Sequence, residues 1–216
     1  MAGPWRAGEV EGFTPFPDDA VARSLGERFA DVAERHADRL AVRSPAGQWT
    51  YGELRDQLRR WGGGIAERLG PGSGRPVAVL ATHDGPLVAA ILAVISAGEM
   101  VVVLDPMAPP PQVQHMVDES ASTLLLHDDA HAEVAAELAA ASPHGCTPVP
   151  FGDLDGAPAD AAPVGPRAPA MLAFTSGTSG SPKGAVITHG LLLNLVRGAT
   201  NALGIGPDDR MPMLFP

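Results

Sequence analysis

Residues 77–104 read VAVLATHDGPLVAAILAVISAGEMVVVL. The segment opens on one apolar run, Val77–Ala81, and closes on another, Met100–Leu104. Both runs have the length of buried strands rather than helices. Between them, Pro86–Ala97 is long enough for a helix, and Gly98 is a typical helix terminator. Two strands this apolar need cover on both faces, which predicts a parallel βαβ unit.

The same alternation of helices and strands continues towards the C-terminus. The pattern predicts helices over Gln112–Glu119, Ala130–Ala141 and His189–Leu203. It predicts strands over Thr123–Leu126, Met171–Phe174 and Ala185–Thr188, and the start of another over Arg210–Phe215. In the last helix we expect the apolar side chains to face inward, namely Leu191, Leu192, Leu195 and Val196.

Two helices are predicted towards the N-terminus by their start signals. Ser24 is followed three residues later by Glu27, and Thr50 by Glu53, which is the spacing of a capping box. Short strands are expected between these helices, over Leu40–Arg43 and Gln48–Thr50.

The fold class that follows is α/β, a mostly parallel sheet with helices on both faces. We divide the chain into an irregular segment, residues 1–22, and one domain, residues 23–216. Within that domain, Ser142–Pro169 is rich in Pro, Ala, Gly and Asp. This composition predicts a long surface loop with little to bury and one short strand near Val149–Phe151, with a domain linker as the alternative.

Composition excludes several classes of function. The formal net charge is −10, which disfavours binding to nucleic acid or to an anionic membrane. The uncharged stretch Pro86–Gly98 is too short to span a bilayer, and Met1–Asp19 lacks the pattern of a signal peptide. Cys146 is the one cysteine, so an intramolecular disulfide is impossible. A cytoplasmic protein is expected.

Residues 175–184, TSGTSGSPKG, connect two predicted strands and carry the strongest chemical signal. Glycines allow a backbone to turn closely around a ligand, and successive N–H groups in such a turn bind anions. Hydroxyls add donors, and Lys183, the only lysine in the sequence, adds a compact positive charge. The predicted phosphate-binding residues are Thr175, Ser176, Gly177, Thr178, Ser179, Gly180, Lys183 and Gly184. A flexible Gly/Ser linker is the alternative interpretation.

This loop differs from the common nucleotide P-loop, in which the lysine is followed by Ser or Thr and opens a helix. Here Lys183 is followed by Gly184 and a predicted strand.

Residues 172–184, LAFTSGTSGSPKG, closely resemble the signature loop of adenylate-forming (AMP-binding) enzymes. Weaker resemblances precede it in the order of that family, at Trp49–Leu54 and at Ala97–Pro106. His189, Leu192 and Asn194 are similar to the helix that follows the loop. The short spacing is closest to the adenylation domains of nonribosomal peptide synthetases and to acyl-CoA synthetases. Two positions depart from the family pattern, Val103 and Gln112.

The resemblance implies a fold and an activity. The chain would form the first part of the large N-terminal domain of an adenylate-forming enzyme and would be incomplete at its C-terminus. That enzyme uses ATP and Mg²⁺ to activate an amino, aryl or fatty acid as an acyl-adenylate, with release of pyrophosphate. The acyl group then passes to the thiol of a carrier protein or CoA. By resemblance, Thr175–Lys183 holds the β- and γ-phosphates, Lys183 is the candidate stabiliser of transition-state charge, and the Mg²⁺ ligands lie mostly outside this chain.

Two other function classes remain open from the sequence. One is a truncated, non-catalytic remnant, a module that binds nucleotide weakly or only docks onto another protein. The other is a phosphotransferase with an unusual loop. For a split enzyme, the partner would be a chain that supplies the missing C-terminal half.

Weaker candidate residues favour structural roles. His127 and His131 have helical metal-ligand spacing but no evident third ligand. The acid pairs Asp18-Asp19 and Asp208-Asp209 lie in turn-like sequence and are expected to face solvent. His189 is expected to start a helix and pack against the preceding strand. Cys146 has no neighbouring base, so nucleophilic catalysis by its thiol is disfavoured.

Overall fold

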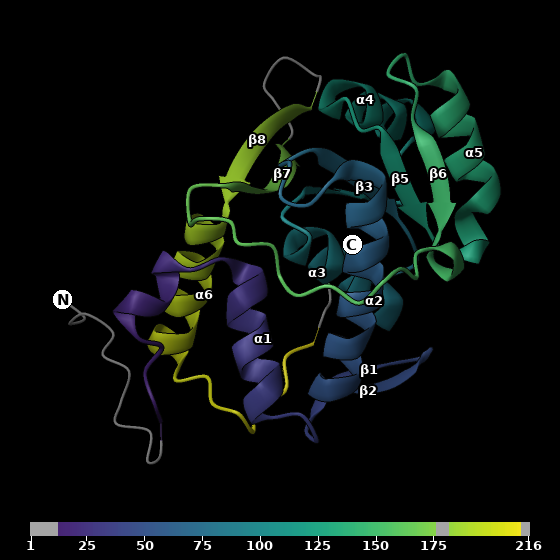
Figure 1. The fold of residues 1–216 in the computed structure, drawn as a ribbon. Coiled ribbons are helices and arrows are strands. Elements are labelled where there is room, and N and C mark those ends of the chain that lie inside the picture. The colour runs from purple at the N-terminus through teal and green to yellow at the C-terminus, as the bar shows by residue number, and fades with distance from the viewer. Residues whose placement is uncertain (1–12, 176–181, 213–216) are drawn as a thin grey trace.

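The computed structural model describes residues 13–175 and 182–212, and its centre is a six-stranded sheet (Figure 1). The strands are β3 (Pro76–Leu80), β4 (Met100–Leu104), β5 (Leu124–His127), β6 (Thr147–Pro150), β7 (Pro169–Thr175) and β8 (Lys183–Thr188). Their order is β6-β5-β3-β4-β7-β8, and every pairing among them is parallel except that of β7 with β8.

Helices cover both faces of this sheet. The helices are α1 (Leu25–Arg35), α2 (Tyr51–Leu69), α3 (Gly85–Ser96), α4 (Pro110–Ser120), α5 (Ala132–Ala141) and α6 (His189–Leu203). Side chains alternate along β3, so that Val77 and Val79 pack with α2 and α3, whereas Ala78 and Leu80 pack with α4 and α5. The predicted α/β class is therefore confirmed.

Shorter strands and 3₁₀ turns accompany the central sheet and its helices. A two-stranded antiparallel hairpin, β1 (Leu40–Ser44) and β2 (Gly47–Thr50), lies between α1 and α2 in sequence. Three 3₁₀ turns are present in the described residues, η1 (Asp18–Ala22), η2 (Asp129–His131) and η3 (Phe151–Asp153). Both predicted capping boxes are confirmed, with the hydroxyls of Ser24 and Thr50 accepting from the N–H groups of Glu27 and Glu53.

A buried carboxylate fixes the connection between α2 and β3. Glu99 is fully buried, and its two oxygens accept hydrogen bonds from Ser73 N at 2.9 Å, Ser73 Oγ at 2.6 Å and Arg75 N at 2.7 Å. These donors offset the cost of burying the charge. The contact ties the loop before β3 to the turn before β4, so both central strands start from a fixed position.

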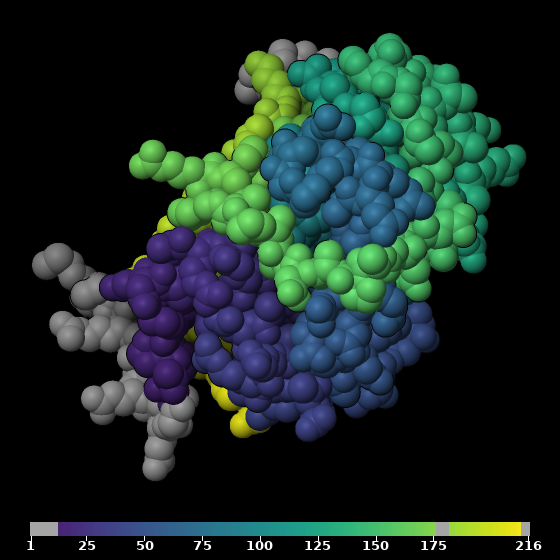
Figure 2. Space-filling view, in the orientation of Figure 1, coloured from purple at the N-terminus to yellow at the C-terminus, as the bar shows by residue number. Residues whose placement is uncertain are grey.

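Three consecutive glycines in α2, Gly62–Gly64, allow another segment to cross the helix in contact with its backbone. A Cβ atom at Gly63 would lie 1.9 Å from the carbonyl oxygen of Ala157, and one at Gly64 would lie 1.7 Å from that of Leu154. Figure 2 shows the crossing segment as a continuous green band between areas of blue. Only a residue without a side chain permits this approach.

The crossing segment corrects the prediction that Ser142–Pro169 has little to bury. Leu154 is fully buried and Ala162 is buried. The N–H of Gly156 donates to Arg60 O at 3.1 Å, and that of Ala162 donates to Ser96 O at 2.7 Å. Backbone hydrogen bonds hold the segment against α2 and α3. Composition does not predict these bonds, because every residue type has the same backbone C=O group and all but proline have the N–H group.

The orientation predicted for the last helix is also wrong. Leu191, Leu195 and Val196 are exposed and Leu192 is partly buried, whereas Leu193 and His189 are the buried residues of α6. The expected strand from Arg210 is not seen in residues 210–212, and the rest of that prediction lies outside the described residues. The prediction fails because helical periodicity identifies an apolar face but does not show whether other parts of the protein cover it.

Described residues near the N-terminus pack against α6. Phe16 N donates to Asn201 Oδ1 at 2.7 Å, and Asn201 Nδ2 donates to Phe16 O at 3.1 Å. Asp18 forms an ion pair with Arg197. This part of the segment predicted to be irregular is therefore attached to the domain and includes the 3₁₀ turn η1.

Candidate functional site

The hairpin of β7 and β8 carries the predicted phosphate loop at its tip. The two strands are antiparallel, and Thr175 lies opposite Lys183 where the described residues meet the loop. Both residues are exposed. The predictions for Ser176, Gly177, Thr178, Ser179 and Gly180 concern positions that lie outside the described residues.

The sheet topology places this tip at a favourable edge for a ligand. β7 is parallel to β4 with Met171 opposite Val101. Extending that register by four residues brings Thr175 level with Asp105, which directly follows β4. The chain leaves β3 for α3 on one face and leaves β4 for α4 on the other. Ligands of open α/β sheets bind at such a divergence, at the carboxyl ends of the strands.

Lys183 is available to a ligand. Its side chain forms no ion pair with any residue in 13–175 or 182–212. The neighbouring Gly184 lies opposite Phe174, and a Cβ there would lie 3.0 Å from Leu172 Cδ1. Gly184 therefore lets the start of β8 lie close against the side chain of Leu172. The described part of the hairpin thus reaches the residues that flank the loop, with the ammonium group of Lys183 on one strand and the hydroxyl of Thr175 on the other.

His115 of α4 contacts the loop flank, which the sequence analysis did not predict. Its Nε2 lies 3.1 Å from the carbonyl oxygen of Pro182, the residue before Lys183. Because a carbonyl oxygen only accepts, Nε2 carries the proton and donates. This contact links the helix that follows β4 to the flank of the predicted phosphate loop. No motif signals it, because the two residues are 67 positions apart.

We expect His115→Leu to weaken ATP binding modestly, about three- to tenfold, because one hydrogen bond that positions Pro182 is lost. His115→Gln keeps a donor on a side chain of similar reach and is expected to restore most of the affinity. Isothermal titration of ATP into each variant measures the effect. Gln112→Leu changes an exposed residue of the same helix and is the control. Equal affinities for His115→Leu and wild type would refute this positioning role.

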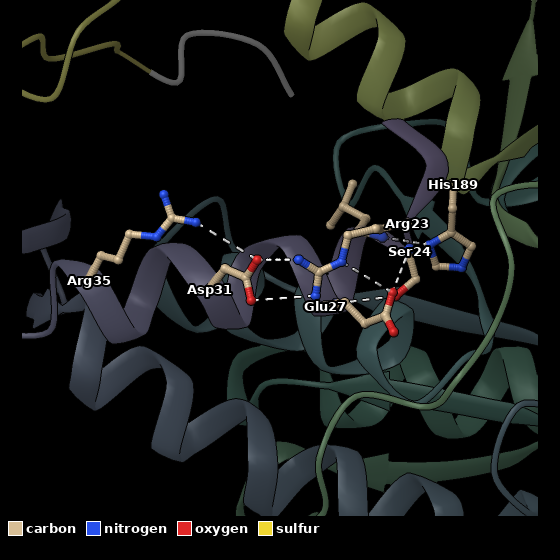
Figure 3. Close-up of polar contacts among 7 residues, drawn as sticks. Arg23, Ser24, Glu27, Asp31, Arg35 and His189 are labelled. Atoms are coloured by element: carbon tan, nitrogen blue, oxygen red, sulfur yellow. Dashed lines mark hydrogen bonds and ion pairs between the residues drawn. The ribbon is translucent and has the colours of Figure 1, made fainter. Parts of the chain in front are cut away.

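His189 joins the start of α6 to the start of α1 (Figure 3). It is fully buried, and its Nδ1 accepts a hydrogen bond from Leu25 N at 3.1 Å. Its Nε2 has no hydrogen-bond partner in the described part of the chain. Burial lowers the pKa of His189, although Glu27 opposes this shift. The neutral ring is therefore the form that fits, and its hydrogen-bond partner is the start of α1, a contact that the sequence did not predict.

This geometry predicts a pH dependence of stability. The unfolded chain takes up the proton below a pKa of about 6.5, whereas the folded protein resists it. The contribution of neutral His189 is thus present above about pH 6.5 and lost as the pH falls towards the lower folded pKa, with a slope approaching about 1.4 kcal/mol per pH unit. His189→Asn retains an acceptor and cannot titrate, so urea unfolding at pH 7.5 and 5.5 should show a weaker pH dependence. An unchanged dependence would contradict this assignment.

The other sequence candidates have local partners. His131 Nδ1 lies 2.5 Å from Asp128 Oδ1, and His127 is buried with Nδ1 2.9 Å from Asp128 O. No group of three His, Cys, Asp or Glu residues in 13–175 and 182–212 could hold a metal ion. Asp208 is exposed and forms an ion pair with Arg39, which lowers the pKa of that carboxyl group. These groups have structural partners and do not form a second site.

Cys146 is partly buried, and this raises the pKa of its thiol to about 11. At neutral pH it is almost entirely protonated and thus a weak nucleophile.

Three hollows in the described surface do not include the hairpin tip, and one of them, about 430 Å³ and lined by Leu80, Pro106 and His131, lies at the carboxyl end of β3. One of about 490 Å³ is lined mainly by α1, α2 and residues 159–161, and one of about 450 Å³ includes Trp49, Trp61 and Phe151. Neither includes Thr175 or Lys183. The candidate site is therefore the exposed hairpin tip at the sheet edge.

Comparison with known proteins identifies the family. The model of the AMP-binding enzyme family matches residues 29–216. Tyrocidine synthase 3 of Brevibacillus parabrevis is 28% identical over 231 residues, which is 97% of this chain and 3% of that protein. Feruloyl-CoA synthase of an Amycolatopsis species is 35% identical over 166 residues, 76% of this chain and 32% of that protein. The chain belongs to the AMP-binding enzyme family of adenylate-forming ligases.

Solved structures agree with this assignment. The nonribosomal peptide synthetase FmoA3 in its alpha-methyl-L-serine-AMP bound form superposes with a TM-score of 0.78 and 29% identity, covering 94% of this chain and 21% of that one. Its AMPPNP bound form gives a TM-score of 0.75 and 30% identity, covering 91% of this chain and 20% of that one. The chain thus spans a third or less of the relatives described here. None of its described helices is long and apolar enough to cross a membrane.

Proposed function

We propose that this chain supplies the phosphate-binding half of an enzyme that activates a carboxylic acid with ATP. The observation that carries the proposal is the position of Lys183, the only lysine, opposite Thr175 at the edge of a mostly parallel sheet where such sheets usually bind ligands. Membership of the AMP-binding family and the FmoA3 structures with AMPPNP and an acyl-AMP support it. The predicted loop residues 175–184 bind the β- and γ-phosphates.

The reaction uses this loop to stabilise a leaving group. A carboxylate oxygen of the substrate attacks the α-phosphorus of ATP, and the bond from that phosphorus to the bridging oxygen breaks. Pyrophosphate departs with the electron pair, and the acyl-adenylate remains. The negative charge that develops on the departing phosphates is stabilised by the Lys183 ammonium and by loop N–H and hydroxyl groups. Lys183 therefore acts on the transition state as well as on bound ATP.

The acid and the thiol acceptor are proposed only as classes. The acid is an amino, aryl or fatty acid, and the acceptor is a carrier-protein thiol or CoA. Relatives include peptide synthetases and a feruloyl-CoA synthase, which supports both types of acceptor. ATP and CoA chemistry suits a cytoplasmic location. The described residues offer no three-ligand metal group, so we expect Mg²⁺ to be bound by the phosphates and by residues elsewhere.

Pyrophosphate–ATP exchange tests this function. The chain is assayed with a pool of amino and aryl acids, alone and together with the part of feruloyl-CoA synthase that follows the region similar to this chain. We expect exchange only in the mixture. Exchange by the chain alone would show that it needs no second half. An absence of exchange in both reactions would favour a non-catalytic remnant.

A further inference from the structure

An aromatic hollow lies where β2, α2, α3, η2 and η3 meet, and it does not include the hairpin tip. We use this name for the hollow of about 450 Å³ that Trp49, Trp61 and Phe151 line. Small-molecule pockets have volumes of about 300–1,000 Å³ and mainly apolar walls with a few polar groups. The aromatic hollow has the size and the kind of lining expected of such a pocket.

The aromatic side chains of the hollow are fixed by their neighbours. The ring centroids of Trp61 and Phe151 lie 5.1 Å apart, and both side chains are mostly buried. Trp49 is partly exposed and lies against the backbone of Gly85, where a Cβ atom would be 2.1 Å from Trp49 Cζ3. Two of the three tryptophans in the sequence therefore meet here. Tryptophan is the aromatic side chain that attracts cations most strongly.

Every charged residue that lines the aromatic hollow is an aspartate, namely Asp128, Asp129 or Asp155. Burial opposes ionisation of Asp128, but hydrogen bonds from Thr82 and His131 outweigh it and lower the pKa of that carboxyl group. Asp128 is therefore a carboxylate at neutral pH.

The other two carboxylates lie at the exposed rim of the hollow. Asp155 is 3.7 Å from Arg60 Nε, which offsets part of its charge. Asp129 is exposed and forms no ion pair with any residue in 13–175 and 182–212. The aromatic hollow thus has an excess of negative charge and one carboxylate available to a ligand.

The larger hollow, of about 490 Å³, differs in this respect. Its lining contains arginines as well as acids, and Arg23 and Arg59 form ion pairs with Asp31 and Asp160. Because these charges offset one another, that hollow has no comparable preference for a charged ligand.

An anion or a metal ion fits the aromatic hollow poorly. The start of α3 lines it, but Gly85 N donates to Asp84 Oδ1 at 2.7 Å, Pro86 has no N–H, and Leu87 N donates to Asp84 O at 3.1 Å. This helix start therefore lacks the free N–H groups that bind anions. No group of three His, Cys, Asp or Glu residues in the described ranges could hold a metal ion. An organic cation matches both the aromatic rings and the carboxylates.

We propose that the aromatic hollow binds a small organic cation, an alkylammonium or guanidinium compound. Its charged group lies between the Asp129 carboxylate and the ring of Trp49, and its carbon atoms contact Trp61 and Phe151. The hollow contains neither of the described loop flanks, Thr175 and Lys183. The inference therefore goes beyond the proposed function and does not depend on it.

Three small probes test the charge preference. They are choline, agmatine and 3,3-dimethyl-1-butanol, which is an uncharged analogue of choline with the same shape. We expect choline and agmatine to bind with dissociation constants on the order of 1 mM or below. The uncharged analogue should bind about five- to tenfold more weakly, because it lacks the attraction of a cation to the rings and carboxylates. Binding is measured by isothermal titration and by NMR.

Matched variants assign the effect to this hollow. Asp129→Asn removes the available carboxylate at nearly constant size and should weaken choline binding about two- to fivefold. Glu133→Gln also removes one exposed negative charge, from α5 outside the lining, and should leave binding unchanged. Trp49→Leu should weaken binding about five- to tenfold. If the loss of the Trp49 contact with Gly85 unfolds that variant, Asp129→Asn still decides, because its side chain is exposed.

A local readout completes the test. Choline should shift the indole N–H signals of Trp49 and Trp61, and Lys183→Ala should bind choline as wild type does. The proposal is overturned if neither cation binds at about 10 mM, tenfold above the expected dissociation constant, or if binding leaves both indole signals unchanged. Equal affinities for choline and its uncharged analogue, or equal effects of Asp129→Asn and Glu133→Gln, would also overturn it.

Discussion

Replacing Gly64 by alanine is expected to lower the free energy of unfolding by about 3–5 kcal/mol, because the added methyl group has no space. A Cβ at this position would lie 1.7 Å from Leu154 O and 2.8 Å from Leu154 C, so the clash is with backbone. Backbone cannot rotate away as a side chain can, and residues 154–157 must leave α2. The loss is a large fraction of the roughly 5–15 kcal/mol that stabilises a typical domain.

Gly62→Ala in the same helix is the matched control. A Cβ there has Ala93 O as its nearest neighbour at 3.7 Å, which is an ordinary contact. Alanine is favoured over glycine inside a helix by about 1 kcal/mol, so this variant should be as stable as wild type or slightly more stable. Urea unfolding midpoints measure both. Wild-type stability of Gly64→Ala would show that residues 154–157 do not cross the helix as described.

This pair of variants shows what sequence patterns could and could not predict. The periodicity of α2 and its capping box at Thr50 were sufficient to predict the helix, because both signals are local. The use of Gly62–Gly64 was not predictable, because it depends on a carbonyl group about ninety residues further along the chain. The composition of residues 142–169 suggested a loose loop, but their backbone hydrogen bonds and Leu154 attach them firmly.

The strands of the sheet were predicted well for a physical reason. Runs such as Met100–Leu104 are apolar throughout. In a strand, such a run has apolar side chains on both faces, so the strand is stable only where both faces are buried. The predicted orientation of α6 was wrong because the helix has more apolar residues than the described part of the chain covers. Leu191 and Leu195 carry the pattern of a buried face, and a local pattern does not reveal whether tertiary packing covers that face.

The candidate site was predicted in part. The sequence placed Lys183 beside a turn between two strands, and the structure confirms the hairpin that holds it. The ligand role of the loop stays a prediction, because residues 176–181 lie outside the described part of the chain. The contacts of His115 and His189 were not predicted, since each joins residues far apart in sequence and no local pattern encodes such pairs.

Lys183→Ala is expected to weaken ATP binding about ten- to hundredfold, equivalent to about 1.4–2.8 kcal/mol. The ammonium group is the only lysine charge in a protein of net charge −10, so nothing of the same kind can replace it. Its side chain is exposed and forms no ion pair with a described residue, so the urea midpoint should change little. The loss should shrink as salt concentration rises, because ions screen an exposed charge.

Two further variants separate local binding from general electrostatics. Arg35→Ala also removes one positive charge, but from the exposed end of α1, and should leave ATP affinity unchanged. Lys183→Arg retains the positive charge on a bulkier planar group. Its ATP affinity should lie between those of wild type and Lys183→Ala, because a guanidinium does not have the compact shape of an ammonium group. If Lys183→Ala and Arg35→Ala weaken ATP binding equally, the effect comes from net charge, and the hairpin tip is not the phosphate site. A selective loss in Lys183→Ala supports phosphate binding at the hairpin tip, beside the carboxyl ends of the parallel strands.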